Sequence, residues 1–576
     1  MPRLTRFHGK LVLSALLAAG LLLPNVVPAQ QLVATDSTQP VSAKEGMVVS
    51  ASAIASEVGA RVLREGGNAI DAAIATGFAL AVTYPTAGNI GGGGFMVIRF
   101  PDGRVTSFDF REKAPLKAHP NMFLDSAGEY SSRIHHNSHI AVGVPGTVAG
   151  FALAHEKYGR LKWQPLVQPS VELARDGFDV PPGLARSLAG ALRRLSQYPA
   201  SLAAYSKNGT PYEEGERFRQ PDLARSLERI MREGRDGFYK GETARLIAEE
   251  MKRGGGLITE EDLARYTAKE RAPLRGQYRG YEIISMPPPS SGGIAMIEML
   301  NILEGFDVKA MGHNSAAHIH HLAESMRRAF RDRAQHVADT DFNEVPIAKL
   351  TSKEYAAELR KSINPNAATP SAPADITADY ESPETTHYSV VDKDGLAVSV
   401  TYTLEAGYGS GIVVPGAGFL LNNEMGDFNG KPGLTTETGL IGTTPNLARP
   451  EQRMLSSMTP SILAKDGKLV AVIGSPGGRT IINTVLQVAS NIIDFGMNIQ
   501  QAVNAPRMHH QWLPDRISIE ADGVTPETVA KLRAMGHTVN VGGRQGTAHS
   551  IMVDPRTGAL LGAPDYRDRD AGAAGR

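Results

Sequence analysis

The sequence has no cysteine among its 576 residues. This excludes disulfides, cysteine nucleophiles, iron–sulfur clusters and cysteine-based zinc sites. It also has no excess of either charge, because Lys plus Arg and Asp plus Glu both number 60, so the basic surplus typical of nucleic-acid-binding proteins is missing. After residue 23 no segment approaches the roughly 20 apolar residues that cross a membrane. A hydrophobic content of 42% is ample for several domains or one large α/β unit.

The N-terminus has the pattern of a secretory signal. Arg3, Arg6 and Lys10 precede a short apolar run over residues 11–23, and small residues follow up to Ala29. We expect cleavage after Ala29, which makes residues 1–29 a signal peptide. The mature protein would then be periplasmic or secreted and free of the membrane, whereas a retained membrane anchor is the alternative.

A polar linker over residues 364–384 ends at Thr385, where a strand-like segment begins. The linker contains four prolines among Ala, Asn, Ser and Asp, which is typical of an exposed loop open to cleavage. An internal threonine hydroxyl is a poor nucleophile. It becomes effective if the chain is cut just before it, because the new α-amine can act as its base. The bond between Glu384 and Thr385 is therefore a candidate cleavage site.

The residues after Thr385 predict a β-hairpin. Strand-like segments over 386–391 and 397–404 flank a turn signal at residues 392–395. If the hairpin is centred on Asp394, Thr385 lies opposite Thr403, and the two side chains share one face of the sheet. A register shift of one residue would separate them. The alternative is a threonine pair that only stabilises a sheet.

Two other patterns resemble a phosphate-binding loop and a metal site, but each lacks residues that such a site needs. The glycines at 91–94 precede a strand over 95–98, but no Lys-Ser/Thr and no helix follow, so tight backbone packing is favoured over a phosphate-binding loop. A helix predicted over 315–337 carries His318, His320 and His321 without a pattern such as H-E-x-x-H. We therefore expect no metal and no cofactor.

Polar residues suited to binding a small charged molecule occur at four places. Arg111 ends a strand, and Glu424 and Asp427 follow another. A serine pair, Ser456 and Ser457, lies in a predicted loop. Residues 474–478 (GSPGG) end a strand and open a helix predicted over 480–495. Backbone N–H groups at a helix start bind anions, and beside a nucleophile they can form an oxyanion hole.

These motifs together resemble the γ-glutamyltranspeptidases, or glutathione hydrolases, of the N-terminal-nucleophile hydrolase superfamily. The specific segments are DFREKAP at 109–115, TTHYSVVD at 385–392, LNNEMGDF at 421–428, RMLSSMTP at 453–460, GSPGG at 474–478 and the bacterial-type NAPRMHHQWLP at 504–514. The resemblance implies an α+β fold, a four-layer αββα sandwich. It also implies a proenzyme that cuts itself between Glu384 and Thr385 into a large subunit (30–384) and a small subunit (385–576), which stay together as one heterodimer.

The resemblance also implies roles for single residues. Thr385 would be the nucleophile for processing and for catalysis, with Thr403 hydrogen-bonded to it. Other roles would be the oxyanion hole (Gly477 and Gly478), the site of the substrate α-carboxylate (Arg111, Ser456 and Ser457) and the site of its α-ammonium group (Glu424, Asp427 and Glu405). Glu405 is the weakest assignment, because many relatives carry asparagine there. The substrates would be glutathione and similar γ-glutamyl compounds, with water, amino acids or dipeptides as acceptors.

Other readings remain open. Residues 432–443 occupy the place of an active-site lid in several relatives, with Thr438 in place of an aromatic residue. A related acylase acting on glutaryl groups of β-lactams would not need an α-ammonium site, so Arg111, Glu424 and Asp427 favour the γ-glutamyl substrate. A capsule-type poly-γ-glutamate transpeptidase would need an open groove, which a lid disfavours. A non-catalytic exported binding protein would not need Thr385, Thr403 or the glycine pair.

Overall fold

The computed structural model describes residues 39–372 and 385–576. The expected signal peptide, the last part of the expected linker and Glu384 lie outside these residues. Among the described residues, no helix is both long enough and apolar enough to cross a membrane.

Two antiparallel sheets of seven strands each form the centre of the fold. The first has the order β1-β18-β17-β13-β12-β9-β8 and the second the order β19-β2-β10-β11-β3-β4-β7. The strands of the first sheet are β1 (Val41–Ala43), β8 (Leu274–Tyr278), β9 (Tyr281–Ser285), β12 (Ser461–Lys465), β13 (Lys468–Ile473), β17 (Ser550–Val553) and β18 (Leu560–Ala563). Those of the second are β2 (Gly46–Ser50), β3 (Gly93–Arg99), β4 (Val105–Phe110), β7 (Lys269–Arg271), β10 (Thr386–Asp392), β11 (Ala397–Thr403) and β19 (Gly572–Gly575).

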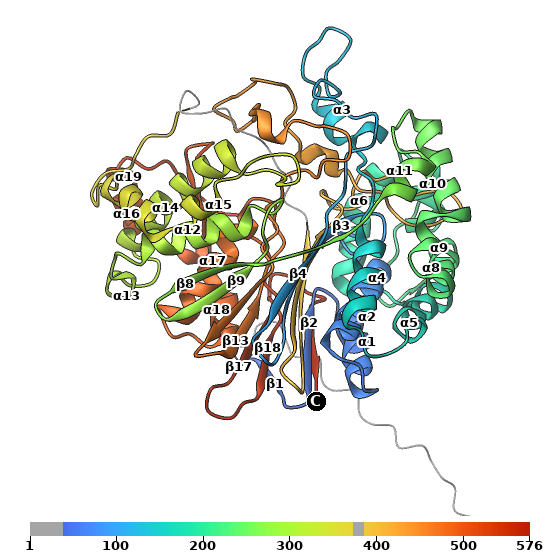
Figure 1. The fold of residues 1–576 in the computed structure, drawn as a ribbon, viewed down its shortest axis with the longest axis horizontal. Helices are drawn as coiled ribbons and strands as arrows, with labels where there is room; N and C mark the ends of the chain where they lie inside the picture. Colours follow the sequence, from blue (N-terminus) through green and yellow to red (C-terminus); the bar gives the residue numbers. More distant parts are fainter. Residues whose placement is uncertain (1–38, 373–384) are drawn as a thin grey trace, which may run out of the picture. The chain divides into compact units, whose positions relative to one another are not determined.

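Helices cover the outer face of each sheet, as Figure 1 shows. The helices on the second sheet and behind it include α1 (Ala53–Arg64), α2 (Ala69–Thr83), α4 (Thr147–Tyr158), α5 (Trp163–Asp176) and α8 (Pro221–Glu233). Those on the first sheet and behind it include α12 (Gly292–Leu303), α14 (Ala316–His336), α16 (Lys353–Lys361), α17 (Thr480–Ile493), α18 (Ile499–Asn504) and α19 (Pro526–Ala534). The result is helix, sheet, sheet, helix, which confirms the predicted α+β fold with four αββα layers.

The central strands of the second sheet are buried on both faces. In β10, Val390 packs in the cluster shared with α2, whereas its neighbour Val391 packs in the cluster between the sheets. In β2, Val48 and Val49 divide in the same way. Because successive side chains of a strand point to opposite faces, both faces of the second sheet are buried.

The β10–β11 hairpin has the predicted register. Ser389 lies opposite Ser399 and His387 opposite Thr401. The turn fixes this register, because the Asp392 carboxylate accepts the N–H groups of Asp394 and Leu396 at 3.0 Å each. The chain therefore enters β10 with Thr385 next to the end of β11.

The glycines at 91–94 pack against neighbouring backbone. A Cβ on Gly92 would lie 2.0 Å from the carbonyl oxygen of Thr403, and one on Gly94 would lie 2.4 Å from that of Thr401. No side chain fits at these distances, so the predicted packing role is confirmed. These glycines bring β3 against the end of β11 that carries Thr403.

Candidate active site

The hydroxyl groups of Thr385 and Thr403 meet at the ends of β10 and β11. The Thr385 Oγ1 donates to Thr403 Oγ1 at 3.4 Å, and both residues are buried. The backbone N–H of Glu405 also donates to Thr403 Oγ1, at 2.8 Å. Thr403 is therefore held in place from the chain that follows it, and the proximity predicted from the hairpin is confirmed.

A pocket lies beside Thr385 and is lined by most of the predicted site residues. They come from distant parts of the chain, before and after Thr385. Its lining consists of Arg111, Thr385, Thr403, Glu405, Glu424, Asp427, Ser456, Ser457, Met458, Gly478 and Ile481. Of the predicted residues that the structure describes, only Gly477 is outside this lining, and it directly precedes Gly478.

Arg111 and two carboxylates form a buried ion cluster in this pocket. The Arg111 guanidinium donates to Glu424 through Nη1 and to Asp427 through Nη2. It also donates to the carbonyl oxygens of Met454 at 3.3 Å and Leu455 at 3.0 Å. The group expected to bind a carboxylate thus pairs with the two groups expected to bind an ammonium.

The same cluster shifts the pKa values of its members. Burial alone would lower the pKa of Arg111, but the adjacent carboxylates of Glu424 and Asp427 raise it above its usual value. Burial raises the pKa of Glu424 to about 8, although Arg111 opposes this shift. Glu112, whose carboxylate lies 3.6 Å from Arg111, has its pKa raised by burial to about 7. The pocket therefore holds more carboxyl groups than its arginine can keep ionised.

The serine pair lies in a loop tied to the start of α12. The carbonyl oxygen of Ser456 accepts from both the N–H and the hydroxyl of Ser291, each at 2.7 Å. Arg333 of α14 donates to the hydroxyls of Ser291 at 2.8 Å and Ser457 at 3.1 Å. These contacts hold the loop whose Ser456 and Ser457 line the same pocket as Arg111.

The glycine pair lies in the loop between β13 and α17. Gly477 has φ +129° and Gly478 has φ +55°, conformations that favour glycine. Their carbonyl oxygens accept from Thr480 and Ile481, which begin α17. Within residues 39–372 and 385–576, neither glycine N–H donates to another protein group. The loop thus holds two backbone N–H groups at the start of a helix, and Gly478 lines the same pocket as Thr385.

Glu405 follows β11 in a left-handed conformation, with φ +77°. It lines the pocket, and its carboxylate accepts from the side-chain amide of Asn423. It therefore lies at the same pocket as Glu424 and Asp427, the carboxylates expected to bind an ammonium group.

The expected lid segment, residues 432–443, leads to a different cavity. Thr438 and Gly439 line it together with His509, Gln511, Pro514, Arg516 and Ser518. The Thr438 hydroxyl bonds to that of Thr436 at 2.8 Å. Thr438 is not among the residues that line the pocket of Thr385.

Sequence reasoning did not assign a role to several residues that support the pocket. Glu112 is fully buried beside Arg111, and Asn422 accepts from Gly143 N at 2.8 Å and from Glu424 N at 3.0 Å. Glu112 belongs to the motif at 109–115 and Asn422 to the motif at 421–428. Their proximity in sequence to Arg111 and Glu424 was therefore the available signal for a role at the site. Met458 and Ile481 add apolar lining, for which the sequence carries no comparable signal.

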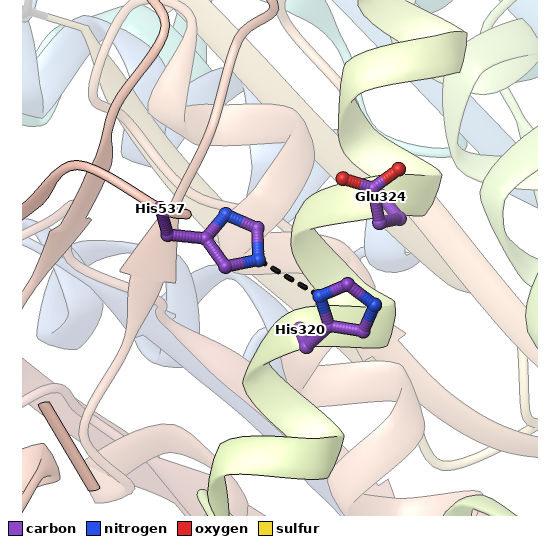
Figure 2. Close-up of side chains that lie close together, drawn as sticks. All are labelled: His320, Glu324 and His537. Atoms are coloured by element: carbon purple, nitrogen blue, oxygen red, sulfur yellow. Dashed lines mark hydrogen bonds between the residues drawn. The ribbon is translucent and has the colours of Figure 1, made fainter. Parts of the chain in front are cut away.

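The predicted histidine helix is α14, and one of its histidines lies in a group that could resemble a metal site. Atoms of His320, Glu324 and His537 lie within 4.8 Å of one another (Figure 2). However, His320 Nε2 contacts the carbonyl oxygen of Asn364 at 2.8 Å, so this nitrogen carries the proton. His320 Nδ1 then accepts from His537 Nε2 at 2.8 Å. Both nitrogens of His320 are thus engaged within the protein.

Comparison with known proteins agrees with this geometry. The family model for gamma-glutamyltranspeptidase matches residues 55–575. The chain is 50% identical over 556 residues to the glutathione hydrolase proenzyme of Escherichia coli (strain K12), covering 96% of this chain and 95% of that protein. It is 47% identical over 544 residues to that of Pseudomonas sp. (strain A14), covering 93% of each. The crystal structure of cephalosporin acylase from Bacillus halodurans superimposes with a TM-score of 0.83 at 28% identity, covering 97% of this chain and 99% of that one. The chain therefore belongs to the gamma-glutamyltranspeptidase family.

Proposed function

We propose that the protein is a self-processing γ-glutamyltranspeptidase and glutathione hydrolase. The observation that carries this proposal is the contact of Thr385 with Thr403 at 3.4 Å, in a pocket that also holds Arg111, Glu424 and Asp427. A threonine nucleophile with buried binders for both charges of an amino acid suits a γ-glutamyl substrate.

The precursor would be cut between Glu384 and Thr385 into residues 30–384 and 385–576. The Thr385 hydroxyl would attack the carbonyl of the preceding residue through an N→O acyl shift. The protein would be periplasmic or secreted after loss of residues 1–29. Because each sheet contains hydrogen-bonded strands from both sides of Thr385, the two subunits would remain one folded unit.

The new α-amine of Thr385 would be the general base in the processed enzyme, because its ordinary pKa of about 7.7–8.0 suits proton transfer near neutral pH. The hydroxyl attacks the γ-carbonyl, and the N–H groups of Gly477 and Gly478 stabilise the oxyanion. The amine portion of the γ-glutamyl substrate leaves, and a γ-glutamyl ester remains on Thr385. Water then releases glutamate, or an amino acid or dipeptide accepts the γ-glutamyl group.

The ion cluster supports a zwitterionic substrate. The α-carboxylate would take Arg111, with the hydroxyls of Ser456 and Ser457, and the α-ammonium would take Glu424 and Asp427. Arg111 would then exchange the protein carboxylates for the substrate carboxylate. Glu424 and Asp427 would exchange Arg111 for the substrate ammonium group. A glutaryl group carries only the carboxylate, so it would remove Arg111 from its partners and leave buried carboxylates unpaired, which is costly. The pocket therefore favours γ-glutamyl over glutaryl substrates, and disfavours the acylase alternative.

Denaturing electrophoresis and N-terminal sequencing test this proposal. We expect two fragments, the smaller beginning with Thr385, and release of p-nitroaniline from γ-glutamyl-p-nitroanilide faster than from glutaryl-p-nitroanilide. The Thr385→Ala variant should remain one chain and should be inactive. A folded and active wild-type protein that stays uncut would refute self-processing, and a preference for the glutaryl compound would favour the acylase.

A further inference from the structure

The loop that follows β11 contains several residues in the left-handed backbone region. Glu405 has φ +77° and Tyr408 has φ +63°. Gly409 and Gly411 also have positive φ values, of +55° and +75°. Residues other than glycine adopt this region rarely, because their Cβ approaches the following carbonyl oxygen. Such conformations are costly and persist only where surrounding contacts hold them. We name residues 405–411 the return loop.

The first residue of the return loop contacts the threonine pair of the candidate active site. The N–H of Glu405 donates to Thr403 Oγ1 at 2.8 Å, and the Thr385 hydroxyl donates to the same oxygen at 3.4 Å. A hydroxyl oxygen has two lone pairs. The N–H of Glu405 occupies one of them, which leaves the other for Thr385. The backbone position of Glu405 therefore fixes the orientation of the Thr403 hydroxyl that accepts from Thr385.

Arg194 binds the return loop at two carbonyl oxygens. It belongs to the last turn of α6 (Pro182–Leu195). Its guanidinium donates to the carbonyl oxygen of Gly407 at 2.8 Å through Nη1 and to that of Gly409 through Nη2. These two carbonyl groups lie on either side of Tyr408 in the sequence. One planar group with several fixed donors therefore spans the left-handed turn, which a lysine ammonium could not do in the same geometry.

Other residues that precede Thr385 support the same loop. The hydroxyl of Ser187, also in α6, is hydrogen-bonded to that of Tyr408 at 2.7 Å. The N–H of Tyr408 donates to the carbonyl oxygen of Thr86 at 2.8 Å. The return loop belongs to the expected small subunit, whereas Arg194, Ser187 and Thr86 belong to the expected large subunit. The large subunit thus holds a loop that the small subunit places next to Thr385.

The charge and the position of Arg194 suit a role that acts through the loop. Burial lowers the pKa of Arg194, and the Glu405 carboxylate opposes this shift, but a guanidinium stays charged at neutral pH. Hydrogen bonds from a charged donor are stronger than neutral ones. Arg194 is not among the residues that line the pocket of Thr385. It can therefore affect the reaction through the return loop and not through contact with a substrate.

We propose that Arg194 is a positioning residue for the reaction at Thr385. It holds the return loop in its left-handed conformation, and the loop holds the N–H of Glu405 on the Thr403 hydroxyl. This inference rests on the proposed function, in which Thr385 is the nucleophile. Without Arg194, Glu405 and Tyr408 would relax towards ordinary negative φ values. The N–H of Glu405 would then leave Thr403, whose hydroxyl could rotate away from Thr385.

A double-mutant cycle with Thr403 tests this route. We would measure kcat and KM for γ-glutamyl-p-nitroanilide in wild type, Arg194→Met, Thr403→Val and the double variant, with electrophoresis to check that processing is complete. Arg194→Met should lower kcat about three- to tenfold, in keeping with the loss of one neutral hydrogen bond. In the Thr403→Val background the same substitution should change kcat less than about twofold, because the hydroxyl that it positions is already absent.

Two results of the cycle would overturn the proposal. Equal losses of kcat in both backgrounds would mean that Arg194 supports the structure in general and not the Thr403 hydroxyl. A loss that falls on KM and not on kcat would mean that Arg194 acts through the Glu405 carboxylate. If Arg194→Met does not fold or is not processed, the same cycle with Arg194→Lys decides the question, because lysine keeps the charge and loses the two-point contact.

The matched control is Arg360→Met. Arg360 lies in the last turn of α16 and also donates to two carbonyl oxygens, those of Ile302 at 3.0 Å and Asn301 at 2.9 Å. These carbonyl groups belong to α12, and Arg360 does not line the pocket of Thr385. The control should therefore leave kcat and KM within about twofold of wild type.

Hydrogen–deuterium exchange of the peptide covering residues 404–411 measures the position of the loop without relying on activity. Arg194→Met should accelerate exchange about tenfold, in keeping with a lost bond to a charged group, and Arg360→Met should leave it unchanged. Unchanged exchange in Arg194→Met would refute the role of Arg194 in holding the loop. If the wild type releases no p-nitroaniline, the proposed function fails, whereas the exchange measurement still decides whether Arg194 holds the return loop.

Discussion

Replacing Asp427 by asparagine should change which acyl groups the enzyme accepts. Asp427 is buried and bonded to Arg111. The asparagine keeps an acceptor for Arg111 but loses the charge that would bind an α-ammonium group. The local turn should survive, because Asn446 donates to the Asp427 backbone oxygen at 2.7 Å. The effect should therefore fall on substrate selection and not on folding.

The magnitude follows from the cost of losing a charged partner. A hydrogen bond to a charged group contributes about 1.5–3 kcal/mol, and each 1.4 kcal/mol is tenfold. We expect kcat/KM for γ-glutamyl-p-nitroanilide to fall about 10- to 150-fold. The glutaryl compound has no ammonium group, so its kcat/KM should stay the same or rise.

Release of p-nitroaniline from both compounds measures this selectivity, with electrophoresis to check that processing is complete. Asp341→Asn is a suitable control, because Asp341 also pairs with an arginine, Arg271, but lies outside the pocket lining. An equal loss on both compounds in Asp427→Asn would refute the reasoning, since it would mean that Asp427 acts only by positioning Arg111.

Three further outcomes are expected. Thr403→Val should lower kcat about tenfold or more, with less effect on KM, because the acceptor at 3.4 Å from the nucleophile is lost. Steady-state kinetics would measure both constants, and a larger effect on KM than on kcat would contradict this role. Gly477→Ala should lower kcat about 10²- to 10³-fold, because its Cβ would lie 2.4 Å from the Thr480 hydroxyl and displace the loop that is proposed to form the oxyanion hole. Unchanged turnover would contradict the proposed role of this loop. In the uncut Thr385→Ala chain, the free energy of unfolding should fall as pH rises from 7 to 9. The window starts at pH 7 because burial lowers the pKa of several histidines, and those groups add stability as pH rises towards their ordinary pKa of 6.5. Burial raises the pKa of Glu112 to about 7 and that of Glu424 to about 8, so the folded chain retains protons that the unfolded chain has released, and each group can remove up to about 1.4 kcal/mol per pH unit. Urea titrations would test this, and a rise in stability towards pH 9 would contradict it.

The contact between Thr385 and Thr403 was predictable because it is local. The two residues are 18 positions apart, and one turn with a capping aspartate sets their register. Strand alternation then decides which side chains share a face. The same local rules predicted the strand β10 and the helix α14 at nearly their observed bounds. Where the residues that determine a contact or an element boundary lie within one hairpin or helix, the local sequence is sufficient to predict it.

The pairing within the pocket was not predictable in the same way. Arg111 is 313 residues from Glu424 and 316 from Asp427. Each motif indicated the type of charge it would bind, but not that the three side chains would bind one another. Thr438 shows the same limit, because the path of the expected lid towards residues 509–518 depends on packing that no local pattern encodes.

The ion cluster has a physical reason that also links processing to catalysis. The precursor has to fold before any substrate is present, and a buried arginine without a partner would cost several kcal/mol. Glu424 and Asp427 remove that cost by pairing with Arg111. A zwitterionic substrate can then replace each half of the pair without leaving a charge unpaired, whereas a substrate with one charge cannot. Under the proposed function, the arrangement that lets the precursor fold would therefore be the same arrangement that selects the substrate.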